Sequence, residues 1–125
     1  MKAITKSSAP AAIGPYSQAV ISNGLLFTSG QIPLVPETMS FIDGTIEEQT
    51  ERVLKNLDAV LAAAGTDWHR LLKTTVFIVD LADFGKMNEV YEHHLGGARP
   101  ARSTVQVAAL PRGAKIEIEL IAEVD

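Results

Sequence analysis

The stretch PARSTVQVAALPRGAKIEIEL, residues 100–120, decides how this chain closes its fold. Apolar and polar residues alternate over about 102–109 and again over about 115–123, on either side of the sequence Pro-Arg-Gly at 111–113. Such alternation is typical of half-buried strands, and proline and glycine favour a turn between them. The stretch therefore predicts two antiparallel strands that pair with each other.

The same pattern predicts where the charged residues of these strands lie. Residues opposite each other in an antiparallel pair share a face, and the apolar residues of both strands need to face the core. Direct pairing then places Arg102 and Thr104 on the same face as Glu117 and Glu119, away from the core.

Two interpretations of these charges stay open. A guanidinium can hold a substrate carboxylate through two parallel hydrogen bonds, and a nearby carboxylate can take a proton from water. Glu117 and Glu119 repel each other on one face, which raises a pKa and favours a usable base. The alternative is a cross-strand ion pair between Arg102 and one of the glutamates on a solvent-exposed face, which is the commoner use of such charges.

The beginning of the chain predicts a β-hairpin. An Asn-Gly pair at 23–24 separates two strand-like runs, about 16–22 and 25–30. Both residues of the pair accept the positive φ that a tight hairpin turn requires. This is the strongest short-range hairpin signal that a sequence offers.

A long helix is predicted at about 46–64, where apolar residues recur at helical spacing. Thr45 and Glu48 form a capping box in front of it, because each side chain can bond the backbone N–H of the other. Gly65 stands where a left-handed residue would end the helix.

The middle of the chain predicts a strand at about 71–79 and a second helix at about 83–95, with Asp83 as its N-cap and a Gly-Gly pair at 96–97 after it. The order of elements suggests an α+β fold, with a mixed, mostly antiparallel sheet and two helices on one face.

The strand at 71–79 is apolar on both faces, because Val76 and Ile78 point one way while Phe77 and Val79 point the other. Two helices cover only one face, so a second cover is needed. We expect a partner subunit to supply it. The alternative is that the long loop at 31–45 folds over that face.

Length, composition and charge limit the class of protein. The chain has 125 residues, no cysteine and a formal net charge of −4, so we expect one domain, residues 1–125, in the cytoplasm. Acids and bases are interspersed, which disfavours nucleic acid as a partner. No run of apolar residues is long enough to cross a membrane.

His93 and His94 are adjacent and diverge around a helix, which is a poor spacing for a metal site.

The stretch RPARSTVQVAALPRGAKIEIE resembles the signature of the Rid family, the reactive intermediate deaminases of the RidA/YjgF type. AAIGPYSQAV, LFTSGQIP, EEQTERVLKNLDAVLAAAG and KTTVFIVDLADFGKMNEVY are also similar to that family, in the same order. The resemblance implies a chorismate-mutase-like fold and a homotrimer around a central barrel, with clefts between subunits. It also implies hydrolysis of reactive enamines and imines, such as 2-aminoacrylate, 2-iminopropanoate and 2-iminobutanoate, to 2-keto acids and ammonia without a metal or cofactor.

Roles carried over from the family fall on specific residues of this chain. The resemblance implies that Arg102 holds the substrate carboxylate and that Glu117 deprotonates the attacking water. Other residues implied in substrate binding are Tyr16, Ser29, Gly30, Asn88 and the main chain at Thr104. Many relatives have cysteine in place of Thr104, so no thiol can act here.

Three functions from different classes remain open at this point. The first is an imine deaminase. The second is a non-catalytic trimer whose clefts bind keto acids for regulation. The third, a ribonuclease like some described relatives, is disfavoured by the acidic balance of the chain.

Overall fold

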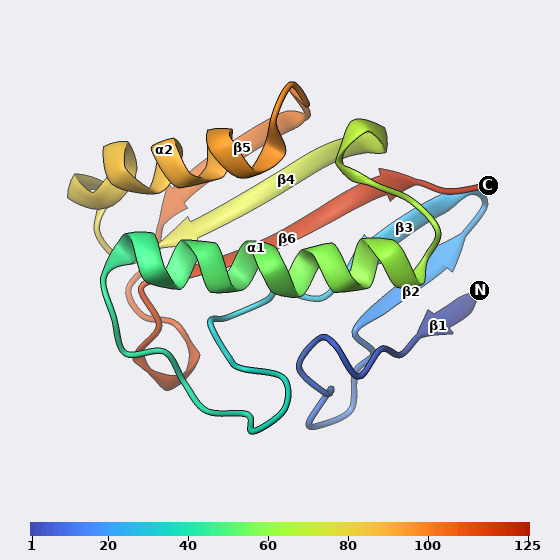
Figure 1. Ribbon diagram of the computed structural model, residues 1–125, viewed down its shortest axis with the longest axis horizontal. Coiled ribbons are helices and arrows are strands. Elements are labelled where there is room, and N and C mark those ends of the chain that lie inside the picture. Colours follow the sequence, from blue (N-terminus) through green and yellow to red (C-terminus); the bar gives the residue numbers. More distant parts are fainter.

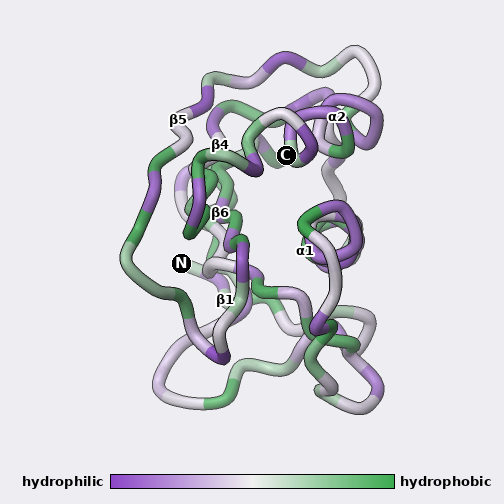
Figure 2. Tube along the Cα trace, turned by 90° about the vertical axis from the view of Figure 1, so that its left-hand side faces the viewer, coloured by the Kyte–Doolittle hydropathy of each residue, from purple (hydrophilic) through white to green (hydrophobic).

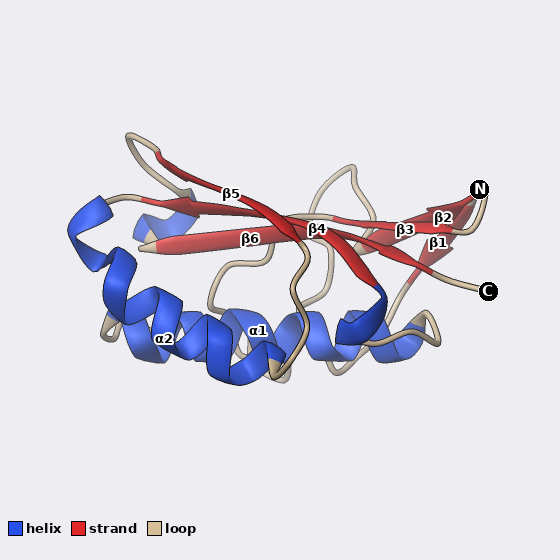
Figure 3. Cartoon of the chain, turned by 90° about the horizontal axis from the view of Figure 1, so that it is seen from above, coloured by secondary structure: helices blue, strands red, loops and turns tan.

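A computed structural model describes residues 1–125 as one six-stranded sheet in the order β1-β2-β3-β6-β4-β5, with both helices packed against one face (Figures 1 and 3). The predicted α+β class and mixed sheet are therefore confirmed. The elements are β1 Lys2–Ile4, β2 Ala19–Ser22, β3 Leu25–Thr28, α1 Ile46–Ala63, β4 Leu71–Ile78, α2 Phe84–Leu95, β5 Ala101–Gln106 and β6 Ile116–Glu123. No helix combines the length and the apolar character needed to cross a membrane.

The first hairpin forms where the sequence predicts it. Strands β2 and β3 pair antiparallel with Ser22 opposite Leu25, so the turn consists of two residues. Asn23 has a φ of 51° and Gly24 a φ of 75°, which are the left-handed conformations that match the twist of a tight hairpin.

The long helix α1 is confirmed together with both of its ends. Thr45 and Glu48 form the reciprocal capping box. At the other end Gly65 adopts a φ of 73°, and the N–H of Thr66 donates to the carbonyl of Leu61 in a Schellman-type ending. Helix α1 buries a stripe against the sheet that includes Val53, Leu54, Leu57, Val60 and Leu61.

The second helix begins at Phe84, and the prediction that the side chain of Asp83 caps it is wrong. Asp83 occupies the N-cap position but its side chain makes no capping hydrogen bond. Asp80 caps the preceding 3-10 turn, Leu81–Asp83, by accepting from the N–H of Ala82.

The predicted pairing of the last two strands is also wrong. Strand β5 pairs in parallel with β4, while β6 pairs antiparallel with the other edge of β4, so β4 lies between them. The reason is the crossover through α2, because a helix that returns the chain to the same end of the sheet places the next strand parallel to the first. The segment at 107–115 then passes the end of β4 to start β6.

This topology reverses the predicted face of Arg102. Arg102 is level with Thr74 on β4, and Thr74 is level with Leu120 on β6. Residues that are level in neighbouring strands share a face, so Arg102 and Thr104 lie on the helix side. Glu117 and Glu119 are level with Phe77 and Thr75, and they lie on the opposite side, as predicted.

The sheet face opposite the helices is left open by this chain (Figure 2). Phe27 and Val105 on that face remain 39% and 42% exposed, and Phe77 is only half-buried. The loop at 31–45 does not cover these residues. It is held beside α1, where the side chain of Asn56 donates to the carbonyl of Leu34. The apolar open face therefore fits the expectation of a partner subunit.

An ion pair that the sequence did not indicate joins the two helices. Nε2 of His94 in α2 lies 2.9 Å from Oδ1 and 3.0 Å from Oδ2 of Asp58 in α1. Trp68 donates its indole N–H to the same carboxylate and packs edge-on against the histidine ring. The hydrogen bond to Asp58 raises the pKa of His94, against the opposing effect of burial.

We predict that this pair makes stability depend on pH. A raised pKa in the folded state stabilises the fold fully below the ordinary value of 6.5, and that contribution is lost as pH rises through the folded pKa. The urea midpoint should therefore fall from about pH 6 to about pH 9 more steeply in the wild type than in His94→Gln. His93→Gln, at the exposed neighbouring histidine, should keep the wild-type slope. Equal slopes for the wild type and His94→Gln would contradict the prediction.

Candidate functional site

Glu117 lies on a cavity of about 570 Å³ between the N-terminal turn, the loop after β3 and strand β6. Tyr16, Ser29 and Gly30 line the same cavity, so four of the predicted site residues come together. The remaining wall is largely apolar and includes Ile13, Ile32, Leu34 and Met39.

Gly30 makes room for the Glu117 side chain. A Cβ atom built on Gly30 would lie 2.7 Å from Cδ of Glu117 and would overlap its carboxylate. The close approach follows from the pairing of the next residue, because Gln31 exchanges backbone hydrogen bonds with Ile118 at 2.9 and 3.2 Å. Glycine at position 30 therefore leaves room for the carboxylate in its present position, and a larger residue would force the Glu117 side chain to move.

Tyr16 stands at the mouth of the cavity with 54% of its surface exposed. The main chain of its turn closes with a hydrogen bond from the N–H of Tyr16 to the carbonyl of Gly14. The phenol oxygen accepts from the N–H of Ile13 at 3.3 Å. The ring is thus held beside the cavity but is free to contact a ligand or a partner subunit.

Gln18 fixes the N-terminal segment that forms one wall of the cavity, and no sequence motif indicates this role. The side chain is buried, donates to the carbonyls of Ala9 and Pro10, and accepts from the N–H of Lys6 at 2.6 Å. Ser29 adds a hydroxyl hydrogen bond to the carbonyl of Ser17. A lone buried glutamine becomes recognisable only when the backbone groups around it are known.

The electrostatics of Glu117 agree with the prediction. Burial raises the pKa of Glu117, and the charge of Glu119 raises it further. Neither glutamate forms an ion pair with Arg102, so the cross-strand pair that the sequence left open does not occur within the chain. A half-buried carboxyl with a raised pKa holds a proton more readily than an exposed glutamate does, and its ionised form is a stronger base toward water.

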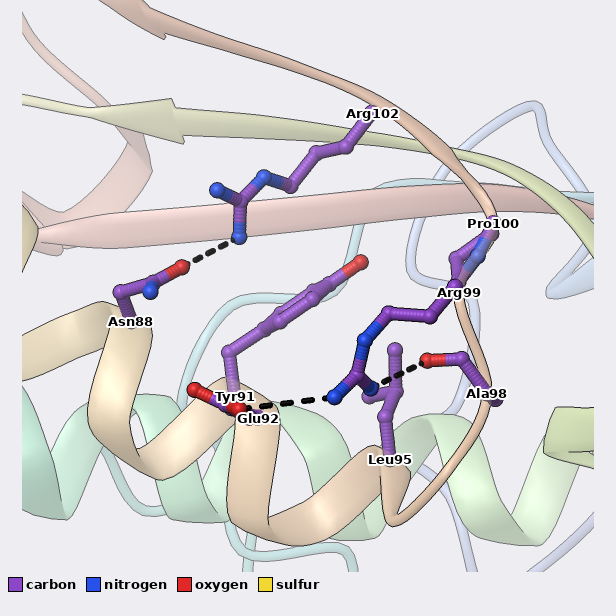
Figure 4. A pocket seen from close by; sticks show the side chains of 8 residues that line it. All are labelled: Asn88, Tyr91, Glu92, Leu95, Ala98, Arg99, Pro100 and Arg102. Atoms are coloured by element: carbon purple, nitrogen blue, oxygen red, sulfur yellow. Dashed lines mark hydrogen bonds and ion pairs between the residues drawn. The ribbon is translucent and has the colours of Figure 1, made fainter.

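Arg102 lies on a separate cavity of about 410 Å³ between β5 and α2 (Figure 4). Its Nη1 donates to Oδ1 of Asn88 at 2.6 Å, and its Cζ lies 4.8 Å from the ring centroid of Tyr91. Asn88, one of the predicted substrate-binding residues, is therefore in direct contact with Arg102.

Thr104 points to the helix side next to Val76, in the same row of β5 as Arg102. Its hydroxyl is enclosed and has no hydrogen-bond partner within the chain. The side chain therefore lies on the same side of the sheet as the guanidinium and away from Glu117.

The predicted site residues thus form two groups on opposite sides of the sheet. Tyr16, Ser29, Gly30 and Glu117 surround one cavity, and Arg102, Asn88 and Thr104 lie on the other side. The prediction that Arg102 and Glu117 share one face of a single chain is wrong, because Arg102 is level with Thr74 and Glu117 with Phe77, which point to opposite faces of β4.

Comparison with known proteins identifies the family. The family model described as Endoribonuclease L-PSP matches residues 6–124. A mouse protein named 2-iminobutanoate/2-iminopropanoate deaminase is 48% identical over 97% of this chain and 90% of its own length.

The chain belongs to the Rid family.

Another sequence relative and a solved structure agree with this Rid assignment. Protein DfrA of Myxococcus xanthus is 55% identical over 97% of this chain and 94% of its own length. The crystal structure of E. coli TdcF with bound serine superimposes on this Rid chain with a TM-score of 0.94, at 43% identity and with all of both chains covered. The fold that the resemblance implied is therefore confirmed.

The Glu117 site of this Rid chain yields a prediction about charge. Glu119→Gln removes a neighbouring negative charge, so the pKa of Glu117 should fall but stay above its ordinary value, because burial is the larger cause. Carboxyl-carbon NMR titration of the two proteins would measure this shift. Glu123→Gln, at an exposed position further along β6, serves as the control. An unchanged Glu117 titration in Glu119→Gln would contradict the account.

Proposed function

We propose that this chain is a 2-iminobutanoate/2-iminopropanoate deaminase, which hydrolyses reactive imines and their enamine tautomers to 2-keto acids and ammonia. Two observations support the proposal. The guanidinium of Arg102 is held in place by Asn88, and the half-buried carboxyl of Glu117 has a raised pKa. The name of the mouse relative and the serine bound to TdcF support a small substrate with a carboxylate and a nitrogen on the neighbouring carbon.

The chemistry needs only positioning and one base. Arg102 binds the substrate carboxylate, and the ionised Glu117 takes a proton from a water molecule as its oxygen forms a bond to the imine carbon. The π electrons of the C=N bond move to nitrogen, which takes up a proton. The resulting carbinolamine then expels ammonia as its C–N bond breaks and C=O forms, which balances as imine plus water giving keto acid plus ammonia.

The active site is assembled between two subunits in this proposal. Arg102 and Glu117 lie on opposite sides of the sheet in one chain, so each cleft combines Glu117 of one protomer with Arg102 of the partner subunit. The open apolar face with Phe27 and Val105 supports a homotrimer that buries this surface around a central barrel. Strand β5 lies at the sheet edge, where a neighbouring subunit can approach Arg102.

The other predicted residues take supporting roles. Tyr16 closes over the ligand from the mouth of the cavity, while Ser29 and Gly30 form its wall beside Glu117. The main chain at Thr104 contacts the imine nitrogen. A thiol has no part in this mechanism, because the side chain that is cysteine in many relatives is a hydroxyl here.

We predict that the protein accelerates the release of 2-oxobutanoate when it is mixed with a threonine dehydratase, compared with the dehydratase alone. Glu117→Gln should lower kcat by about 100-fold or more, because a general base is lost. Activity of the wild type should fall as pH decreases through the raised pKa of Glu117, since the protonated acid cannot accept a proton from water.

The matched control is Glu123→Gln on the same strand, which should retain wild-type activity. Release of 2-oxobutanoate that is no faster than with the dehydratase alone would contradict the proposal. If calorimetry still showed that 2-oxobutanoate binds, the result would favour the non-catalytic keto acid binding module.

A further inference from the structure

Helix α2 presents three side chains to the guanidinium of Arg102. Phe84, Asn88 and Tyr91 are spaced four and three residues apart, so they lie on one face of the helix. Cζ of Arg102 lies 5.4 Å from the ring centroid of Phe84 and 4.8 Å from that of Tyr91, both within the range of cation–π attraction. Figure 4 shows the guanidinium above the Tyr91 ring, with Nη1 directed at Asn88.

Tyr91 is itself held in place by a hydrogen bond to strand β4. It is 7% exposed, and its hydroxyl lies 2.8 Å from the hydroxyl of Thr74, which is fully buried in β4. Thr74 is also the residue level with Arg102 across the β4–β5 pair. The position of the aromatic ring and the position of the arginine backbone are therefore set by the same residue of the central strand.

The contact with Asn88 determines which edge of the guanidinium stays available. Nη1 is engaged with the amide oxygen of Asn88, whereas Nε and Nη2 of Arg102 have no partner in the chain. These two nitrogens form an edge with two parallel N–H groups, which is the geometry that binds a carboxylate through both oxygens. Asn88 is neutral, so it orients the cation without neutralising it.

We propose that Tyr91, together with Phe84 and Asn88, is a positioning residue that holds Arg102 with its Nε–Nη2 edge ready for the substrate carboxylate. This inference rests on the proposed function, in which Arg102 binds that carboxylate. It changes the role of Asn88 from a substrate contact to an orienting partner, and it gives Tyr91 a role that the sequence did not indicate. Tyr91 acts through Arg102 and touches no substrate.

The first test needs no ligand. ¹⁵N relaxation of the Arg102 Nε–H group should report an ordered side chain in the wild type and a mobile one in Tyr91→Leu, because the aromatic platform is lost. Tyr91→Phe keeps the ring but loses the bond to Thr74, so its order parameter should fall between the two. An unchanged Arg102 order parameter in Tyr91→Leu would overturn the proposal.

The second test measures 2-oxobutanoate binding by calorimetry. Tyr91→Leu should weaken the wild-type affinity about tenfold, and it should have no effect in an Arg102→Ala background, because the ring acts only through the arginine. In turnover assays Tyr91→Leu should raise KM about tenfold and leave kcat within about twofold, since the lost interaction is equal in ground and transition states.

The control for general destabilisation is Val90→Ala, which removes core packing on the same helix away from Arg102. It should lower the thermal midpoint without changing the Kd for 2-oxobutanoate.

A similar loss of affinity in Tyr91→Leu with and without Arg102, or a wild type that does not bind 2-oxobutanoate, would overturn the inference. A wild type that binds 2-oxobutanoate through Arg102 but turns over no imine would overturn the proposed function alone.

Discussion

The parallel pairing of β5 with β4 is the constraint on which the rest of the structure depends. The crossover through α2 brings the chain back to the edge of β4, and the register places Arg102 level with the buried Thr74. Arg102 consequently lies under α2, where Asn88 and Tyr91 hold it. Strand β6 must then use the other edge of β4, and its register places Glu117 level with Phe77, on the opposite side of the sheet from Arg102. A single chain built in this way contains both residues of the proposed catalytic pair and keeps them apart.

The same constraint leaves one face of the sheet without a cover from this chain. Both helices are used on one face, so the apolar side chains of the other face, including Phe27 and Val105, have no cover within the chain. Burying them against other subunits is favourable by roughly 25 cal/mol for each Å² of apolar surface removed from water. In the proposed trimer this burial and the completion of the active site are one event, because each cleft needs Arg102 of the partner subunit.

Local signals in the sequence predicted local structure well. The Asn-Gly turn at 23–24 and the capping box of α1 depend on neighbouring residues only, and both are confirmed. The sequence also predicted the face of Glu117, because the alternation in β6 fixes it. The direction of the Glu117 pKa was predicted from the neighbouring charge of Glu119, whereas the larger cause, burial, depends on tertiary packing. The pairing of β5 could not be read in the same way. Alternation determines which residues share a side of one strand, but it does not determine which strand becomes the neighbour, and here the crossover through α2 decided that.

The central claim is that each active site combines residues of two subunits, and mixing two inactive variants tests it most directly. Arg102→Ala and Glu117→Gln would be co-refolded in equal amounts and assayed for release of 2-oxobutanoate. Random assembly gives about one cleft in four an intact Arg102 and an intact Glu117, so the mixture should recover about a quarter of the wild-type activity. A mixed assembly that stays as inactive as its two parents would contradict the claim.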